Sequence, residues 1–350
     1  MPRTSHCAKR EPCSHDPCRD RRIGALGTLA RRIGARQERE LFFVRGHTRT
    51  RASAEDFCGA HGVPLVNTYD ELLADPDVDA LVLATPHSRH EAQIIAAAAA
   101  GKHIHVEKPI TLDRAGADRA VDAARDAGVV LAVGYCRRFH PSVVELRRRL
   151  AQGRLGAVVS MVAQHTTSTA QFIAPDNWRA TSAEAPGGAL TAVGVHALDH
   201  MIEFAGRVRD VRCVTAGAIP GPCDDTTTVM LRFASGATGL IFCSVATATN
   251  FSFTLYGNKG LAEISKPNLQ RLRFVPISDR APSGPVIAPP DEISEHPGFD
   301  MLNAELNAFA RAIREGEPYP IPLEEVLHGM SVFDAIVEAA RSNTIVAVAG

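Results

Sequence analysis

Hydrophobic and polar positions follow two different patterns along this chain, and the change falls near Pro141. Before it, short runs that are apolar at nearly every position alternate with stretches of helical periodicity. The predicted buried strands are residues 78–84, 103–106 and 129–133. Strands that are apolar on both faces are typical of parallel sheets with a helical layer on each side. We therefore expect an α/β domain of the dinucleotide-binding type over residues 21–140.

Helix signals fill the intervals between these strands. The predicted helices are residues 52–61, 70–76, 90–100 and 111–127, with Thr111 as the cap of the last. Gly62, Gly101 and Gly128 stand where three of these helices should stop. At the start of the domain, residues 23–28 are predicted as a strand entering a glycine turn. Residues 29–39 are predicted as the following helix and residues 40–44 as a second strand.

After Pro141 a helix over residues 142–151 is followed by stretches in which apolar and polar positions alternate. These stretches predict an antiparallel sheet, with turn signals between several of them. They are residues 158–165, 208–216, 226–233, 237–245, 251–256 and 261–264. Further helices are expected over residues 194–205, 300–315 and 322–342, and the proline-rich residues 276–299 are expected to form a loop. Residues 141–350 therefore predict an α+β domain.

Charge is balanced over the 350 residues, with a net value of −1, but the first 51 residues hold 13 Lys/Arg against 5 Asp/Glu. A basic segment favours nucleic acid, anionic lipid or a phosphate-bearing cofactor. Aromatic residues are not interleaved with it, so nucleic acid is disfavoured as a partner. No run of about 18 apolar residues predicts a membrane span, and the N-terminus lacks the apolar core of a signal peptide. We expect a cytoplasmic protein whose partner is a small-molecule substrate, with no membrane partner.

Residues 1–20 show little periodicity and are expected to be a disordered tail. This segment holds Cys7, Cys13 and Cys18 together with His6 and His15. Structural zinc sites usually present paired ligands at close spacing, and no CxxC pair occurs here. A tail with incidental cysteines is therefore favoured over a zinc site, and we expect no metal.

Polar residues follow the predicted parallel strands at the edge where ligands bind in open α/β sheets. Glu107-Lys108-Pro109 ends one strand abruptly, because proline cannot donate to a sheet ladder. There the Lys108 ammonium could polarise an oxygen or transfer a proton, although a solvated lysine is the commoner outcome. Thr85 and Pro86 follow another strand and could line a cofactor cleft, whereas His87 and His90 could merely cap the next helix. Tyr135 and Arg138 follow the last strand; a surface arginine is the alternative for Arg138.

The glycine-rich turn expected of a dinucleotide site is incomplete. Gly24 and Gly27 are three residues apart and Thr28 follows, but Leu29 occupies the place of a further close glycine. Thr48 and Arg49 come at the end of the second strand, where an acidic residue would bind an unmodified ribose. A basic residue there favours a 2′-phosphate, and so NADP over NAD. An exposed basic loop is an equally good interpretation from this segment alone.

In the second domain, Gly187 and Gly188 precede a helix that carries His196, with Asp199 and His200 close to the same face. His196 is either a functional group or a core histidine satisfied by hydrogen bonds. A metal site on His196 and His200 lacks a third ligand. Trp178 and Arg179 could cover a nicotinamide ring or pack between the domains.

Together these stretches resemble the Gfo/Idh/MocA family of NAD(P)-dependent oxidoreductases. The resemblance is carried by residues 84–86, 101–109, 135–141, 178–179 and 187–199, with the strand segments 225–236 and 256–263. It implies a Rossmann domain followed by an α+β domain with a large, mostly antiparallel sheet, and homo-oligomers formed through that sheet. It also implies hydride transfer between NADP (or NAD) and a secondary alcohol or ketone of a sugar, polyol or cyclic diol.

The resemblance also implies roles for single residues. Lys108 matches the lysine that contacts substrate and cofactor, and His196 matches the base that takes the hydroxyl proton, so these two are the catalytic candidates. The cofactor-binding candidates are Gly24, Gly27, Thr28, Thr48, Arg49, Thr85, Pro86, His90, Glu107, Lys108, Arg138, Trp178 and Arg179. The substrate-binding candidates are Lys108, Tyr135, His196 and Asp199.

Two departures from the family pattern bear on activity. Many members carry an aspartate four residues before the histidine, where this chain has Ala192. The N-terminal glycine turn is degraded, and the first helix looks short. A non-catalytic dinucleotide-binding or regulatory protein and an NAD-using glycoside hydrolase are therefore the alternative functions.

Overall fold

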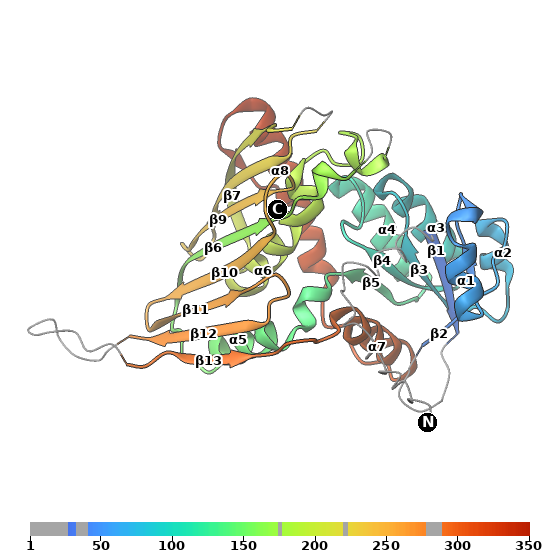
Figure 1. Cartoon of the computed structure of the whole chain (residues 1–350), viewed down its shortest axis with the longest axis horizontal. Coiled ribbons are helices and arrows are strands. Elements are labelled where there is room, and N and C mark those ends of the chain that lie inside the picture. Colours follow the sequence, from blue (N-terminus) through green and yellow to red (C-terminus); the bar gives the residue numbers. More distant parts are fainter. Residues whose placement is uncertain (1–26, 33–40, 174–176, 220–222, 278–288) are drawn as a thin grey trace, which may run out of the picture.

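The computed structural model describes residues 27–32, 41–173, 177–219, 223–277 and 289–350. Within these residues the chain forms two sheets, one of five strands and one of nine, each with its own helices (Figure 1). The candidates Gly24, Cys7, Cys13 and Cys18 lie outside the described residues, as does the expected tail.

The first sheet contains the parallel strands that the apolar runs predict. Its strand order is β2-β1-β3-β4-β5, in which β3 (Ala80–Ala84), β4 (His103–Glu107) and β5 (Leu131–Gly134) are parallel neighbours. Residues such as Leu81, Ile104 and Val106 are fully buried between the sheet and its helices. The helices of this domain are α1 (Glu55–His61), α2 (Tyr69–Ala74), α3 (His90–Ala99) and α4 (Arg114–Asp126).

Two local predictions need correction here. Helix α4 is capped by Asp113, whose side chain accepts a hydrogen bond from the Gly116 N–H, and not by Thr111. The strand predicted at residues 40–44 is β2 (Phe42–His47), which lies a few residues later.

The first strand differs most from expectation. Residues 29–32, predicted as part of a helix, belong to β1 (Gly27–Arg32), which runs antiparallel to both β2 and β3. Only nine residues separate β1 from β2. A parallel pair needs a crossover of about a dozen residues or more, whereas an antiparallel pair accepts a short connection. The short connection therefore accounts for the reversed strand.

The second sheet is mostly antiparallel, as the alternating pattern predicts. Its order is β13-β12-β11-β10-β6-β9-β8-β7-β14, and the pair β6–β9 is parallel. Strand β13 falls inside the segment predicted as loop, because its four residues pair with β12. The strands are β6 (Val158–Thr166), β7 (Val208–Ala216), β8 (Thr226–Phe233), β9 (Thr238–Ser244), β10 (Asn250–Gly257), β11 (Gly260–Ser265), β12 (Arg271–Pro276), β13 (Glu292–Glu295) and β14 (Val346–Ala347).

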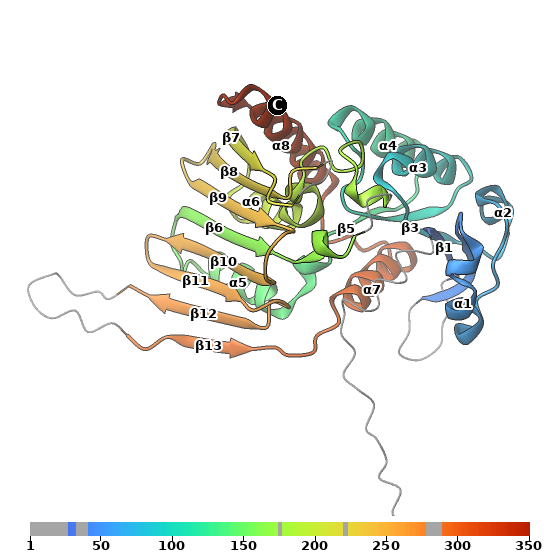
Figure 2. The ribbon, with the colours of Figure 1, turned by 45° about the horizontal axis from the view of Figure 1, so that its top comes forward.

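Helices α5 (Pro141–Ala151), α6 (Val195–Ala205) and α8 (Leu323–Ser342) lie on one side of this sheet (Figures 1 and 2). Helix α8 packs against β7, α6 and α4, so it lies along the boundary between the two domains. Helix α7 (Met301–Arg314) returns to the first sheet, where Phe309 packs against Ala80 and Ala132. Among the described helices, none combines the length and apolar character needed to cross a bilayer.

Candidate active site

Lys108 joins the two domains at the carboxyl end of β4. Its Nζ donates a hydrogen bond of 2.8 Å to the backbone carbonyl oxygen of Ala192 in the second domain. The side chain of Ala192 itself is exposed. The Lys108 ammonium therefore binds the backbone of position 192, where the family pattern has an aspartate side chain.

His196 lies one turn after this contact, in the first turn of α6, and is 8% exposed. The Tyr135 ring meets it edge-on, with the ring centroids 6.2 Å apart. Burial lowers the pKa of His196 well below its ordinary value, and the charge of Lys108 lowers it further. The ring is therefore neutral near pH 7, the state in which an imidazole can accept a proton. Its Nδ1 is buried and finds no hydrogen-bond partner among the described residues.

A π-helical turn, η7 (Leu190–Gly194), leads into α6 and carries Ala192. The glycines before it allow a close backbone approach: Gly188 has φ +56°, and a Cβ there would lie 2.4 Å from the Asp224 carbonyl oxygen. Isolated π-helical turns interrupt the regular hydrogen-bond ladder and occur frequently at functional sites. The turn thus presents the Ala192 carbonyl to Lys108 just before His196.

Arg138 and Asp199, expected in the cofactor and substrate contacts, instead form a buried ion network. Arg138 is 4% exposed and donates to both carboxylate oxygens of Asp199, at 2.8 and 2.7 Å, and to Glu325 Oε2 at 2.6 Å. Burial opposes the charge of Arg138, but the Asp199, Glu203 and Glu325 carboxylates outweigh it and raise the pKa of the guanidinium. Since both Asp199 oxygens bind Arg138, this carboxylate is placed to brace α6 rather than to activate His196.

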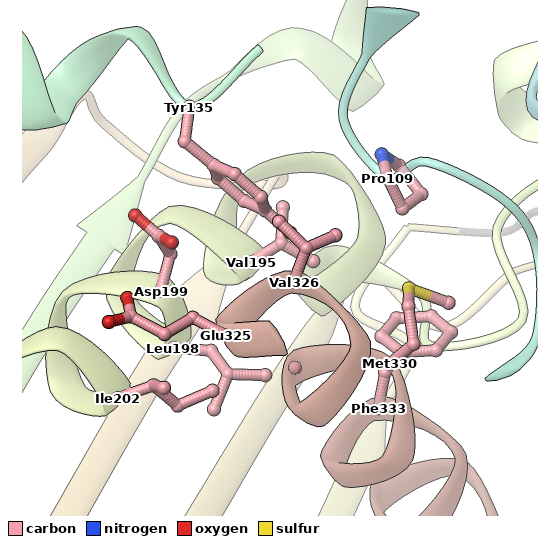
Figure 3. A pocket seen from close by; sticks show the side chains of 11 residues that line it. Pro109, Tyr135, Val195, Leu198, Asp199, Ile202, Glu325, Val326, Met330 and Phe333 are labelled. Atoms are coloured by element: carbon pink, nitrogen blue, oxygen red, sulfur yellow. The ribbon is translucent and has the colours of Figure 1, made fainter. Parts of the chain in front are cut away.

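A cavity of about 10 Å³ lies beside this network, between α6, α8 and the end of β4. Figure 3 shows Tyr135 pointing toward it, with the Asp199 and Glu325 carboxylates on one side and Met330 and Phe333 on the other. That volume holds about one water molecule, which is too little for a substrate. A larger hollow, of about 260 Å³, lies behind the glycine turn, and neither Lys108 nor His196 lines it.

The end of β3 meets the second domain through a group of contacts. Packing of Trp178 and Arg179 between the domains was one of the two expectations, whereas the contacts of Glu184 were not predicted from the sequence. Ser88 donates to the Glu184 carboxylate from both its N–H and its hydroxyl, and His87 Nδ1 lies 2.7 Å from the Glu184 carbonyl oxygen. Trp178 meets the His87 ring edge-on at 5.1 Å, and the Arg179 guanidinium lies 4.1 Å from the Trp178 ring centroid. We call these five residues the interdomain clasp. Glu184 has no motif around it that would have identified it.

Residues next to the clasp hold the β3 end in place. His90 is fully buried, with Nδ1 3.0 Å from the Pro109 carbonyl oxygen and Nε2 3.1 Å from that of Thr85. The Thr85 hydroxyl donates to Gln93. His90 therefore ties the β3 and β4 ends together, which is a structural role and not a ligand contact. Pro86 is partly buried at the same edge.

Glu107 is the other residue at this edge whose charge the fold controls. It is partly buried, and burial together with Glu305 of α7 raises its pKa. Glu305 is fully buried, with Oε2 3.3 Å from His105 Nε2, and burial raises its pKa well above the ordinary value. No local pattern identifies Glu305, which lies about 200 residues away from its partners on β4.

The remaining cofactor candidates lie at the same edge of the sheet. Gly27 pairs with Ala84 and Thr28 pairs with His47, while Thr48 and the exposed Arg49 follow β2. A nicotinamide dinucleotide fits the residues present at its ring end, where Lys108, Pro86 and the Trp178 indole offer an ammonium and apolar surface. At its phosphate end, the described residues provide a strand at Gly27–Arg32 where a glycine turn followed by a helix was expected. Within the described ranges, no three His, Cys, Asp or Glu side chains gather as metal ligands.

Comparison with known proteins identifies the family. Residues 23–135 match the model of the oxidoreductase family with an NAD-binding Rossmann fold, and residues 143–263 match the Gfo/Idh/MocA C-terminal domain. The chain is 30% identical to trans-1,2-dihydrobenzene-1,2-diol dehydrogenase of Sus scrofa over 242 residues, which cover 69% of this chain and 70% of that protein. It is 31% identical to the same enzyme of Oryctolagus cuniculus over 216 residues, 61% of this chain and 64% of that protein. The match to the rabbit enzyme thus spans just under two thirds of its length.

A solved structure agrees with this result. Levoglucosan dehydrogenase in complex with NADH and levoglucosan superposes with a TM-score of 0.78, covering 86% of this chain and 88% of that one at 24% identity. At this identity the similarity establishes the fold. With the two matched domains and the pig relative, it shows that this chain belongs to the Gfo/Idh/MocA oxidoreductase family.

Proposed function

We propose that this protein is an NADP-preferring oxidoreductase that interconverts a secondary alcohol and a ketone on a sugar, polyol or cyclic diol. The observation that carries the proposal is the contact between Lys108 and η7, the turn directly before His196. Lys108 comes from the first domain and His196 from the second. The names of the relatives support this substrate range, since one is a dehydrogenase of a dihydrobenzenediol and another a dehydrogenase of levoglucosan.

In the alcohol-to-ketone direction, His196 takes the proton of the substrate hydroxyl. Its lowered pKa keeps the ring neutral before the reaction, so it can act as a base at neutral pH. Lys108 then stabilises the negative charge that grows on the substrate oxygen toward the transition state. The Ala192 carbonyl fixes the direction of the Lys108 ammonium by accepting one of its hydrogen bonds. In the reverse direction His196 returns the proton to the ketone oxygen.

The ring end of the dinucleotide would be held by Pro86, Lys108, Trp178 and Arg179. When bound, the nicotinamide supplies a hydride acceptor or donor for the substrate carbon. Arg49, exposed after β2, would face the adenosine ribose and favour a 2′-phosphate. The His87–Trp178 and Ser88–Glu184 contacts would keep water out of the cleft from the β3 side.

Cofactor binding is the first test. Trp178 is the only tryptophan of the chain, so its quenching by NADPH reports directly on the site. We expect quenching together with enhanced emission of the reduced nicotinamide, and turnover in a panel of polyols and keto sugars. Absence of any binding at millimolar NADPH or NADH would overturn the proposal. Arg49→Ala should weaken NADPH more than NADH, and Arg125→Ala, an exposed arginine on α4, serves as its control.

A non-catalytic dinucleotide-binding protein is the second candidate. The exposed alanine at position 192 and the reversed β1 both favour it. It predicts NADPH binding without turnover of any polyol or keto sugar. Slow cleavage of a glycoside that requires catalytic NAD would instead indicate the hydrolase alternative.

We also propose that the protein forms homo-oligomers through the second sheet. No described helix lies over the outer face of this sheet in either view (Figures 1 and 2). That face carries four large exposed side chains, Val214, Met230, Leu240 and Tyr256. An apolar patch bounded by polar side chains is typical of an interface. Light scattering after size exclusion should show more than one chain for the wild type and a smaller species for Met230→Glu. Val144→Glu on α5, which is also exposed, should leave the mass unchanged.

A further inference from the structure

Arg137 and His165 form a buried pair beside the candidate active site. Arg137 belongs to η4 (Cys136–Phe139), directly after the last strand of the first domain, and His165 belongs to β6 of the second. Arg137 Nη2 lies 3.0 Å from His165 Nε2, and its Cζ lies 4.5 Å from the Phe251 ring centroid. Both side chains are less than a tenth exposed.

The chemistry of this pair determines which nitrogen of His165 carries the proton. A guanidinium can only donate, so Nε2 must accept. In the neutral ring the proton then lies on Nδ1, which donates to the Val193 carbonyl oxygen at 3.0 Å. Arg137 therefore orients His165, and His165 binds the backbone of η7.

Two successive backbone carbonyls of η7 therefore accept hydrogen bonds from side chains of different domains. Lys108 binds Ala192 O and His165 binds Val193 O, three residues before His196. A turn whose two adjacent carbonyls are both hydrogen-bonded has little freedom to rotate. The first turn of α6, which carries His196, follows η7 directly.

We infer that Arg137 and His165 are positioning residues that hold η7, and through it His196, in the orientation needed for proton transfer. The catalytic consequence of this inference rests on the proposed function. The hydrogen bonds that join Arg137, His165 and η7 do not depend on it. The role assigned to Arg137 and His165 is to orient the turn, and it is separate from the base activation that a carboxylate at position 192 would supply.

The same pair contributes to the charge state of His196. The groups that act on the His196 ring are Lys108 from β4, Arg137 from η4, His165 from β6 and His200 from its own helix, with the Tyr135 ring against it. Asp199 is held by Arg138. After burial, the charges of Lys108 and Arg137 lower the pKa of His196 further. Removing the charge of Arg137 should therefore raise the pKa of His196.

Nitrogen-15 NMR of the histidine rings tests the structural part without any substrate. In the wild-type protein, the His165 signal should show the Nδ1–H tautomer. In Arg137→Met the His165 ring should no longer be held in the Nδ1–H tautomer. The titration midpoint of His196 should move to higher pH. Arg149→Met is a matched control, since Arg149 is also buried and lies 5.0 Å from an aromatic ring, that of Phe274. It should leave both signals unchanged.

Wild-type His165 in the Nε2–H tautomer, or a His196 midpoint that does not move in Arg137→Met, would overturn the inference. If Arg137→Met does not fold, Arg137→Lys and His165→Asn provide the same information. The lysine keeps the charge, and so should keep the His196 midpoint. The asparagine keeps a donor toward Val193 O but no longer accepts from Arg137.

Turnover of a substrate identified in the panel tests the catalytic part. We expect kcat to fall about 10- to 100-fold in His165→Phe with little change in KM, and less in His165→Asn. Equal activity of His165→Phe and wild type would contradict the positioning role. If NADPH does not bind or nothing is turned over, the proposed function fails, while the NMR result still decides whether the pair holds the turn.

Discussion

Lys108 Nζ lies 2.8 Å from the carbonyl oxygen of Ala192, so an ammonium at a strand end of the first domain meets the turn before His196 in the second. This contact brings the two catalytic candidates, which belong to different domains, close together at the domain boundary. It also means that the ammonium is oriented by a backbone dipole, which cannot be titrated or removed by a side-chain substitution.

Lys108→Met should lower turnover about 100- to 1000-fold, because the charge growing on the substrate oxygen loses its main partner. The affinity for NADPH, measured by Trp178 quenching, should change little. Lys102→Met is the control, since Lys102 lies at the other end of the same strand and donates to the carbonyls of Asp75 and Val78. An active Lys108→Met protein would contradict the assigned role.

Ala192→Asp should raise kcat by roughly tenfold, because a carboxylate near Lys108 and His196 stabilises the protonated imidazole. The pKa of His196 should rise, so the acid limb of the kcat profile should move to higher pH. The side chain at position 192 is exposed, which leaves room for the substitution. Ala192→Asn keeps the size without the charge and should shift neither quantity. The same pH profile for all three proteins would show that the carboxylate does not act on His196.

Arg138→Met should destabilise the protein by about 3–5 kcal/mol, because it leaves buried carboxylates without their counter-ion. Urea denaturation measures the loss. Adding Asp199→Leu should recover part of it, since both Asp199 oxygens bind this guanidinium. Arg148→Met removes an exposed ion pair with Glu145 and should change the free energy of unfolding far less. If Arg138→Met destabilised the protein as little as Arg148→Met, the ion network of Arg138 would add nothing to stability.

His328→Gln should change how stability depends on pH. Burial lowers the pKa of His328 to about 4, and its Nε2 accepts a hydrogen bond from the Val208 N–H. Below pH 6.5 the unfolded chain protonates this histidine while the folded protein does not, so stability is lost as pH falls from 6.5 toward 4. The slope from one such group is about 1.4 kcal/mol per pH unit. Glutamine cannot titrate, so the slope should fall by about that amount between pH 6.5 and 4. Parallel stability curves for the two proteins would exclude His328 as a contributor.

The sequence by itself determined the α/β-then-α+β order and the strand ends that carry Thr85 and Lys108. Apolar runs identify β3, β4 and β5 because burial on both faces leaves a local signature. Alternation identifies six strands of the second sheet, because burial of only one face leaves a period of two residues. The short interval before β2 was a further local signal, because the helix expected there looked too short. The direction of β1 could not be inferred from that signal, because it depends on the pairing of β1 with β3.

Only the tertiary structure decided which side chains meet. Arg138 and Asp199 are 61 residues apart and bind each other, and Glu325 joins them from α8. His165 reaches Val193, and Glu184 reaches Ser88, although none of these residues has a distinctive local pattern. Local periodicity reports whether a residue is buried, because burial depends on the face of its own helix or strand. The partner of a buried charge depends on how separate elements pack, and that information is distributed over the whole chain.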